Sequence, residues 1–146
     1  MKLKYTLFLF LLLGLSACRD KIDTGPHVMH YGEDVCERCK MIISDKRFAG
    51  QIVDQKGTAL KFDDVGCLSE YLKESAEQGG KPLAMYVADF ATGEWLDAGK
   101  AFYLRNPELR SPMGYNIAAF GTAEEMDVSP FREGGEEAGG FGELVK

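Results

Sequence analysis

Downstream of residue 34, apolar residues recur in short segments that are separated by polar and glycine-containing turns. Residues 48–53 have a strand-like pattern, and residues 60–62 form a second short apolar segment. The Lys56-Gly57 pair between the two segments is typical of a tight turn. The pattern therefore predicts a β-hairpin.

A helix is predicted directly after this hairpin. Asp63 or Asp64 can cap its first turn, and apolar residues follow from Val65 at positions i, i+3 and i+7, which places them on one face. Gly79-Gly80 ends the helical pattern. Residues 83–88 are almost wholly apolar and predict a buried strand after the helix.

The second half of the chain repeats this order less clearly. After further strand-like segments at residues 95–96 and 101–104, residues 115–120 resemble another strand, and the spacing of Thr122 and Glu125 forms a capping box at the start of another helix. Pro130 interrupts that helix early. We therefore predict an α+β fold of two small lobes of antiparallel strands, each with a helix in a ββαβ-like order.

The first residues of the chain have a different pattern. Lys2 and Lys4 precede an unbroken apolar run at residues 7–13, which is typical of a secretory signal and is too short to span a bilayer. The run ends in Leu-Ser-Ala-Cys, which resembles the lipobox of bacterial lipoproteins. We therefore predict a signal peptide at residues 1–17 and a lipid-modified N-terminus at Cys18.

The segment that follows the lipidated cysteine lacks apolar periodicity. Residues 18–34 contain glycine and proline and predict a lipid-anchored tether, with the folded domain at residues 35–146. A lipoprotein of this kind belongs to the cell envelope. We expect it to be anchored to a membrane and to face the periplasm or the cell exterior.

The composition restricts the function further. The chain has 146 residues and a net charge of −6, which suits one domain that can bury a core without disulfides. The acidic balance argues against nucleic-acid binding and against electrostatic attraction to anionic lipids, so membrane attachment must come from the acyl chains on Cys18. The sequence has no nucleophile elbow, zinc-protease helix or phosphate loop. We therefore predict no catalytic residues and no enzyme activity.

Three sulfur-bearing side chains lie within six residues: Cys36, Cys39 and Met41. Two residues between the cysteines let both sulfurs point at one centre from a tight turn. If the chain is extended beyond Cys39, Met41 would place its thioether on the same face. Thiolates and thioethers together favour Cu(I) over harder ions. Met41 taken singly can equally fill a gap in the core.

Cys67 is the third thiol of the mature chain. An odd number of thiols in an exported protein indicates a reactive thiol, an intermolecular bridge or a metal site. Cys67 falls in the first turn of the predicted helix, away from the middle of its apolar stripe, where the helix dipole favours a thiolate. Two alternatives stay open: a small buried hydrophobe, or a spare thiol beside a Cys36–Cys39 disulfide.

Three segments resemble, in order, the sequence motifs of the NosL family, whose members are lipoproteins that act as copper chaperones in the assembly of nitrous oxide reductase. They are residues 36–52 with Cys-Glu-Arg-Cys-Lys-Met, residues 61–67 with Phe-Asp-Asp-Val-Gly-Cys, and residues 111–115, Ser-Pro-Met-Gly-Tyr. The resemblance implies a two-lobed α+β fold and Cu(I) as the bound metal. It implies nitrous oxide reductase or its maturation machinery as the partner.

The resemblance also implies metal ligands. Cys39 and Met41 match the family's Cys-x-Met motif, and Met113 matches the methionine of its Ser/Thr-Pro-Met-Gly motif. Other members carry one cysteine in the first motif, often followed by a glycine. Here Cys36 is additional and Lys40 replaces that glycine. The number of ligands is therefore open, and Cys36 and Cys67 are further candidates.

Two alternatives come from different classes of protein. The three-cysteine layout also resembles TRASH-type metal-binding modules, which permits structural Zn(II) with His30 as a fourth ligand, although His30 lies in the predicted tether and can equally be solvated. The Cys36/Cys39 pair also permits a thiol-disulfide redox protein. That function would require a thioredoxin-like context with the pair at a helix N-terminus.

Overall fold

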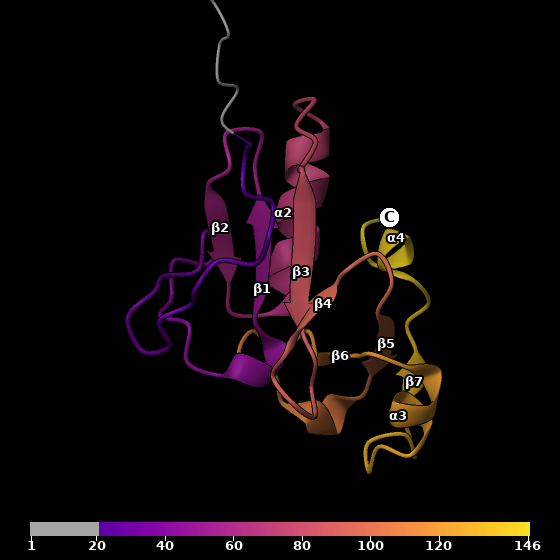
Figure 1. The fold of residues 1–146 in the computed structure, drawn as a ribbon. Helices are drawn as coiled ribbons and strands as arrows, with labels where there is room; N and C mark the ends of the chain where they lie inside the picture. The colour runs from indigo at the N-terminus through magenta and orange to yellow at the C-terminus, as the bar shows by residue number, and fades with distance from the viewer. Residues whose placement is uncertain (1–20) are drawn as a thin grey trace, which may run out of the picture.

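The computed structural model describes residues 21–146 (Figure 1). The predicted signal peptide and the lipidation site Cys18 lie outside the described residues. Within residues 21–146, no helix is long and apolar enough to cross a membrane.

The first lobe is a four-stranded antiparallel sheet covered by one long helix (Figure 1). Its strands are β1 (Gly50–Val53), β2 (Ala59–Phe62), β3 (Ala84–Ala88) and β4 (Trp95–Asp97), and they lie in the order β2-β1-β3-β4. A one-turn 3-10 helix, η1 (Lys46–Phe48), leads into β1. The predicted hairpin is confirmed, since β1 and β2 pair antiparallel on either side of residues 54–58.

The helix α2 (Val65–Ala76) begins at the predicted position because Asp64 caps it. The Asp64 carboxylate accepts a hydrogen bond from the Gly66 amide at 2.9 Å, which satisfies one of the free amides of the first turn. The predicted stripe of Val65, Leu68 and Leu72 is buried and belongs to the core under the sheet. Burial of this face holds the helix against the strands.

The second lobe is a smaller antiparallel sheet of three strands, in the order β6-β5-β7. Its elements are β5 (Phe102–Arg105), η2 (Pro107–Leu109), β6 (Ile117–Phe120), α3 (Ala123–Asp127), β7 (Glu136–Glu137) and the terminal α4 (Phe141–Leu144). Thr122 and Glu125 form the predicted capping box at the start of α3. The helix ends upstream of Pro130, as expected.

The two lobes join just after the end of β3. Asp89 pairs with Ala119 of β6 in an isolated bridge, and its carboxylate accepts a hydrogen bond from the Gly121 amide at 3.0 Å. The Phe90 ring lies between Phe48 and Phe120, with ring centres 5.5 and 5.8 Å away, in a small apolar cluster. The predicted two-lobed α+β fold is therefore confirmed.

The segment upstream of Val35 lies along the first sheet. The Gln51 side chain bonds the His27 backbone at both its amide and its carbonyl, and the Tyr86 hydroxyl donates to the Thr24 carbonyl at 2.8 Å. Met29 is buried in the main core. The packed part of the chain therefore begins upstream of the boundary that the sequence pattern placed at residue 35.

Candidate metal centre

A tight turn carries the first two thiols. The Cys36 amide donates to the Met41 carbonyl at 2.8 Å, and the Lys40 amide donates to the Cys36 carbonyl at 3.0 Å. Lys40 adopts a φ of 62°, the left-handed conformation that closes the turn. The Glu37 amide donates to the Lys61 carbonyl at 2.7 Å, so the turn is fixed to the end of β2.

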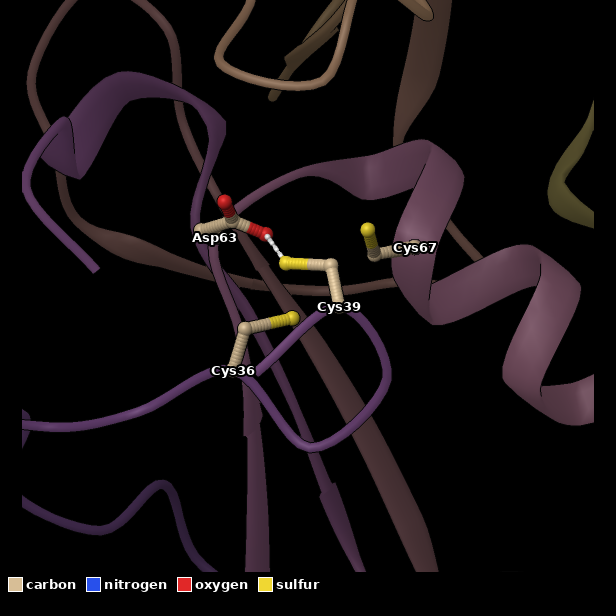
Figure 2. A group of neighbouring side chains, drawn as sticks. All are labelled: Cys36, Cys39, Asp63 and Cys67. Atoms are coloured by element: carbon tan, nitrogen blue, oxygen red, sulfur yellow. Dashed lines mark hydrogen bonds between the residues drawn. The ribbon is translucent and has the colours of Figure 1, made fainter. Parts of the chain in front are cut away.

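The other two members of the site come from the junction between β2 and α2. Asp63 directly follows the last residue of β2, and Cys67 lies in the first turn of the helix, facing the cysteine turn (Figure 2). The candidate ligand atoms of Cys36, Cys39, Asp63 and Cys67 all lie within 4.8 Å of one another. All three cysteines are free thiols. Three sulfurs and one carboxylate oxygen therefore converge on one point, as a four-coordinate metal site requires.

The members of this group differ in exposure. Cys36 and Cys67 are fully buried and Asp63 is only 2% exposed, whereas Cys39 is partly exposed. The Cys39 thiol donates a hydrogen bond to Asp63 Oδ1 at 3.4 Å (Figure 2). A metal ion would enter from the side of Cys39.

The three thiols of the group have pKa values that are shifted in opposite directions. A hydrogen bond from the Cys67 thiol lowers the pKa of Cys36, and the backbone amides of Cys39 and Asp63 lower it further. The same hydrogen bond and burial raise the pKa of Cys67, whereas burial raises the pKa of Cys39. The lowered pKa of one thiol in this group favours a thiolate in the metal-free site, and the thiolate is the form that binds a cation.

The loop between β5 and β6 meets the site from the second lobe. The Met113 amide donates to Asp64 Oδ2 at 3.0 Å, which places this loop beside the N-terminus of α2. The Tyr115 ring lies directly over Gly66, where an added Cβ would fall 1.9 Å from the ring. Arg38 completes the contact, since its guanidinium donates to both Glu74 and the Tyr115 hydroxyl.

The two methionines suggested by the family resemblance are both at the surface. Met41 is 57% exposed and Met113 is 38% exposed, so neither fills a gap in the core. The expectation that Met41 follows Cys39 in an extended segment is wrong, because Lys40 turns the chain between them. The Met41 backbone amide instead faces the Cys39 sulfur and acts to lower the pKa of that thiol.

His30 is not a member of the group. Its exposed imidazole lies 3.8 Å from the Asp34 carboxylate, and Asp63 takes the fourth place that a zinc site with His30 would have used. The Cys36/Cys39 pair lies on a turn ahead of β1, and it is Cys67 that lies at a helix N-terminus. The pair therefore lacks the setting that a thioredoxin-like redox centre needs.

Asp63 is the member that the sequence analysis missed, since the aspartate pair was interpreted only as a source of the helix cap. Consecutive side chains of an extended backbone point to opposite sides, and Asp64 is extended, with φ −146° and ψ 138°. Only one aspartate of the pair can therefore cap the helix. That alternation was available from the sequence and would have directed Asp63 toward the thiols.

Comparison with known proteins agrees with this architecture. The sequence matches the NosL family over residues 28–144. A search among curated proteins gives no match. Among solved structures, the chain is similar to the crystal structure of the copper chaperone NosL from Shewanella denitrificans, with a TM-score of 0.64 and 16% sequence identity, over 79% of this chain and 90% of that chain. At this level of identity the likeness shows a shared fold.

Proposed function

This chain belongs to the NosL family, and we propose that it is a copper chaperone that binds Cu(I) at the thiol site and transfers it to another protein. The convergence of Cys36, Cys39 and Cys67 carries the proposal, because three thiolates form a soft donor set that suits Cu(I). The solved relative from Shewanella denitrificans is itself named a copper chaperone.

A gradient of exposure supports carriage rather than permanent binding. Cys36 and Cys67 are buried, Cys39 is partly exposed, and Met41 and Met113 are exposed residues. Thioethers are weaker donors than thiolates, so a copper ion can leave by exchanging its buried ligands for exposed ones in steps. In this mechanism Cys39 is the ligand common to the buried and the exposed state.

The family resemblance supports a proposal for the protein that receives the copper and for the location of this chain in the cell. We propose nitrous oxide reductase or its maturation machinery as the recipient, and a lipid anchor at Cys18 that holds the chain at a membrane of the cell envelope. The described chain starts beside the turn between β1 and β2, where Ile22 contacts Gly57, while the thiol site lies at the other end of β2 (Figure 1). In this arrangement the site lies away from the anchored end, where a partner protein can reach it.

Structural zinc is the second candidate, and Asp63 is the observation that favours it. Three cysteines and one carboxylate make a complete tetrahedral set for Zn(II), a borderline ion that accepts oxygen. A zinc site of this kind would be closed, and the exposed methionines would have no function in it.

One titration separates the two candidates. The full chain, purified in detergent and reduced, is offered Cu(I) and Zn(II) in competition with chelators, beside the variants Cys39→Ser and Met113→Leu. A copper chaperone prefers Cu(I), loses it in Cys39→Ser and binds it more weakly in Met113→Leu. Preference for Zn(II), with the methionine variant unchanged, would reject the copper function.

A further inference from the structure

The Asp64 carboxylate makes more contacts than a helix cap requires. Its Oδ1 accepts from the Gly66 amide, which completes the cap of α2. Its Oδ2 accepts from the Ser111 hydroxyl at 2.6 Å and from the Met113 amide at 3.0 Å. Asp64 is fully buried, so water does not compete for the hydrogen bonds that its Oδ2 accepts from the second lobe.

The loop that Asp64 holds is not regular structure. Arg110 and Asn116 flank it with φ angles of 49° and 56°, and this left-handed conformation costs a residue such as arginine about 1–2 kcal/mol, whereas asparagine adopts it readily. Ser111 and Asn116 bond each other, from the Ser111 amide to Asn116 Oδ1 and from the Asn116 amide to Ser111 Oγ. Asp64 is the buried point on the first lobe to which this loop is bonded, beside the more exposed contact of Arg38 with Tyr115.

The position of Asp64 along the chain links the loop to the thiols. Asp63 and Asp64 are consecutive, and the extended backbone sends their side chains to opposite sides. Asp63 joins the cysteines, whereas Asp64 holds the backbone of Met113. One short segment at the junction of β2 and α2 therefore places a carboxylate at the thiols and another at the loop.

We propose that Asp64 is a positioning residue for copper transfer, because it holds the Met113 backbone where the exposed thioether can accept copper from the thiol site. The proposal rests on the copper function proposed above. Asp64 contacts no metal itself, and it acts through the Met113 amide. In this proposal Cu(I) passes from the thiols of the first lobe to the Met113 thioether of the second lobe.

The substitution Asp64→Asn tests this directly. An asparagine keeps an acceptor for the Gly66 amide, and asparagine caps helices as well as aspartate does. Its amide nitrogen replaces Oδ2 and presents a donor to the Met113 amide, which is also a donor. The substitution therefore keeps the cap and breaks the hold on the loop.

The readout is a double-mutant cycle in Cu(I) affinity on the full chain in detergent. Asp64→Asn and Met113→Leu are each expected to weaken Cu(I) binding by about tenfold, in the range for residues that orient metal ligands. Asp64→Asn releases the Met113 thioether from its position and Met113→Leu removes it. Because both changes act on the same ligand, the double variant is expected to lose no more Cu(I) affinity than either single variant. Thr122→Ala is the matched control, since it removes the cap of α3 without contact to the loop.

Several outcomes overturn the proposal. The first two are Cu(I) affinity equal to that of the wild type in Asp64→Asn or in Met113→Leu. The third is a loss of affinity in the double variant equal to the product of the two single losses. The fourth is a loss in Thr122→Ala as large as that in Asp64→Asn. In each case Cu(I) binding by the wild-type chain still supports the proposed function, although wild-type affinity in Met113→Leu would also remove Met113 from the proposed release route. Failure of the wild-type chain to bind Cu(I) would reject the function and this proposal with it.

Discussion

The two lobes share one topology and differ in what they carry. In the first lobe, β1, β2, α2 and β3 follow each other, and the strands lie in the order β2-β1-β3 before β4 is added. In the second lobe, β5, β6, α3 and β7 follow each other, with the equivalent order β6-β5-β7. The candidate metal ligands are therefore not a property of the topology. They come from side chains at particular positions of it.

The helix starts show this difference most clearly. In the second lobe, Thr122 and Glu125 bond only within their own capping box. In the first lobe, Asp64 caps α2 and also bonds the other lobe, while Asp63 faces the thiols. The same strand-to-helix junction is a simple cap in one lobe and part of the candidate metal site in the other.

The connections between the first two strands differ as well. Residues 54–58 make a tight turn between β1 and β2, whereas residues 106–116 make a long connection between β5 and β6. The longer connection carries Met113 and reaches the N-terminus of α2. One lobe supplies buried thiols, and the other supplies an exposed thioether on a loop.

The largest effect is expected from removing a buried thiol of the first lobe. Cys67→Ser should weaken Cu(I) binding by at least about a hundredfold, or about 2.7 kcal/mol, because a hard hydroxyl replaces a soft thiolate. Competition with a Cu(I) chelator measures this loss. Met126→Leu, a buried sulfur in the second lobe, is the matched control and should bind like the wild type. Equal binding by Cys67→Ser and the control would remove α2 from the site.

The contact between the lobes is tested by adding one methyl group. Gly66→Ala places a Cβ 1.9 Å from the Tyr115 ring, so the loop of the second lobe must move, at a cost of about 1–3 kcal/mol. Thermal unfolding followed by circular dichroism measures the change. Gly142→Ala, in the helix α4 with nothing within 4 Å, should be neutral or slightly stabilising. Equal stability of the two variants would contradict the packing of Tyr115 on α2.

A smaller effect of opposite sign is expected at Asp63. Burial raises the pKa of this carboxyl from its ordinary 3.8, so the folded metal-free chain holds the proton more tightly than the unfolded chain does. Stability from this group is present at low pH and is lost as the pH rises from that value through the raised pKa. Asp63→Asn should therefore raise the melting temperature of the metal-free chain at neutral pH while weakening metal binding.

The pH dependence gives the check for Asp63. Melting temperatures of the wild type and of Asp63→Asn should differ most at neutral pH and converge as the pH falls toward 4, the ordinary range of the carboxyl. A melting temperature of Asp63→Asn below that of the wild type at neutral pH would show that the carboxylate stabilises the metal-free fold.

The smallest effects concern the left-handed residues of each lobe. Lys40 in the cysteine turn and Arg110 before the methionine loop adopt φ angles of 62° and 49°. Lys40→Gly and Arg110→Gly should each stabilise the chain by about 0.5 kcal/mol, because relief of strain exceeds the added entropy of the unfolded chain. Denaturant unfolding measures both. Lys40→Ala is the control and should give no gain; a gain equal to that of glycine would exclude backbone strain as the cause.

The fold was largely predictable because local signals agreed with the packing. The Lys56-Gly57 turn, the apolar stripe from Val65 and the Thr122 capping box each specify one element, and each is found in the structure. The N-terminal segment was harder to place. Its contacts depend on single side chains, such as Gln51 bonding His27, that leave no periodic pattern in the sequence.

The site was predictable only in part, for a physical reason. Cysteine spacing and the helix position of Cys67 indicated thiols that could converge, and the structure brings the three together. The course of the chain after Cys39 was mispredicted, because a lysine gives no signal that it will adopt a left-handed turn. The exposed positions of Met41 and Met113 depend on tertiary packing, and their function as ligands stays a prediction.

X-ray absorption at the copper edge, on the full chain loaded with one Cu(I), tests most directly whether the buried thiols of the first lobe hold the metal. The account predicts at least three sulfur ligands in the wild type and one fewer in both Cys36→Ser and Cys67→Ser. The same sulfur count in the wild type and in both variants would contradict it, since copper would then be bound without the buried thiols.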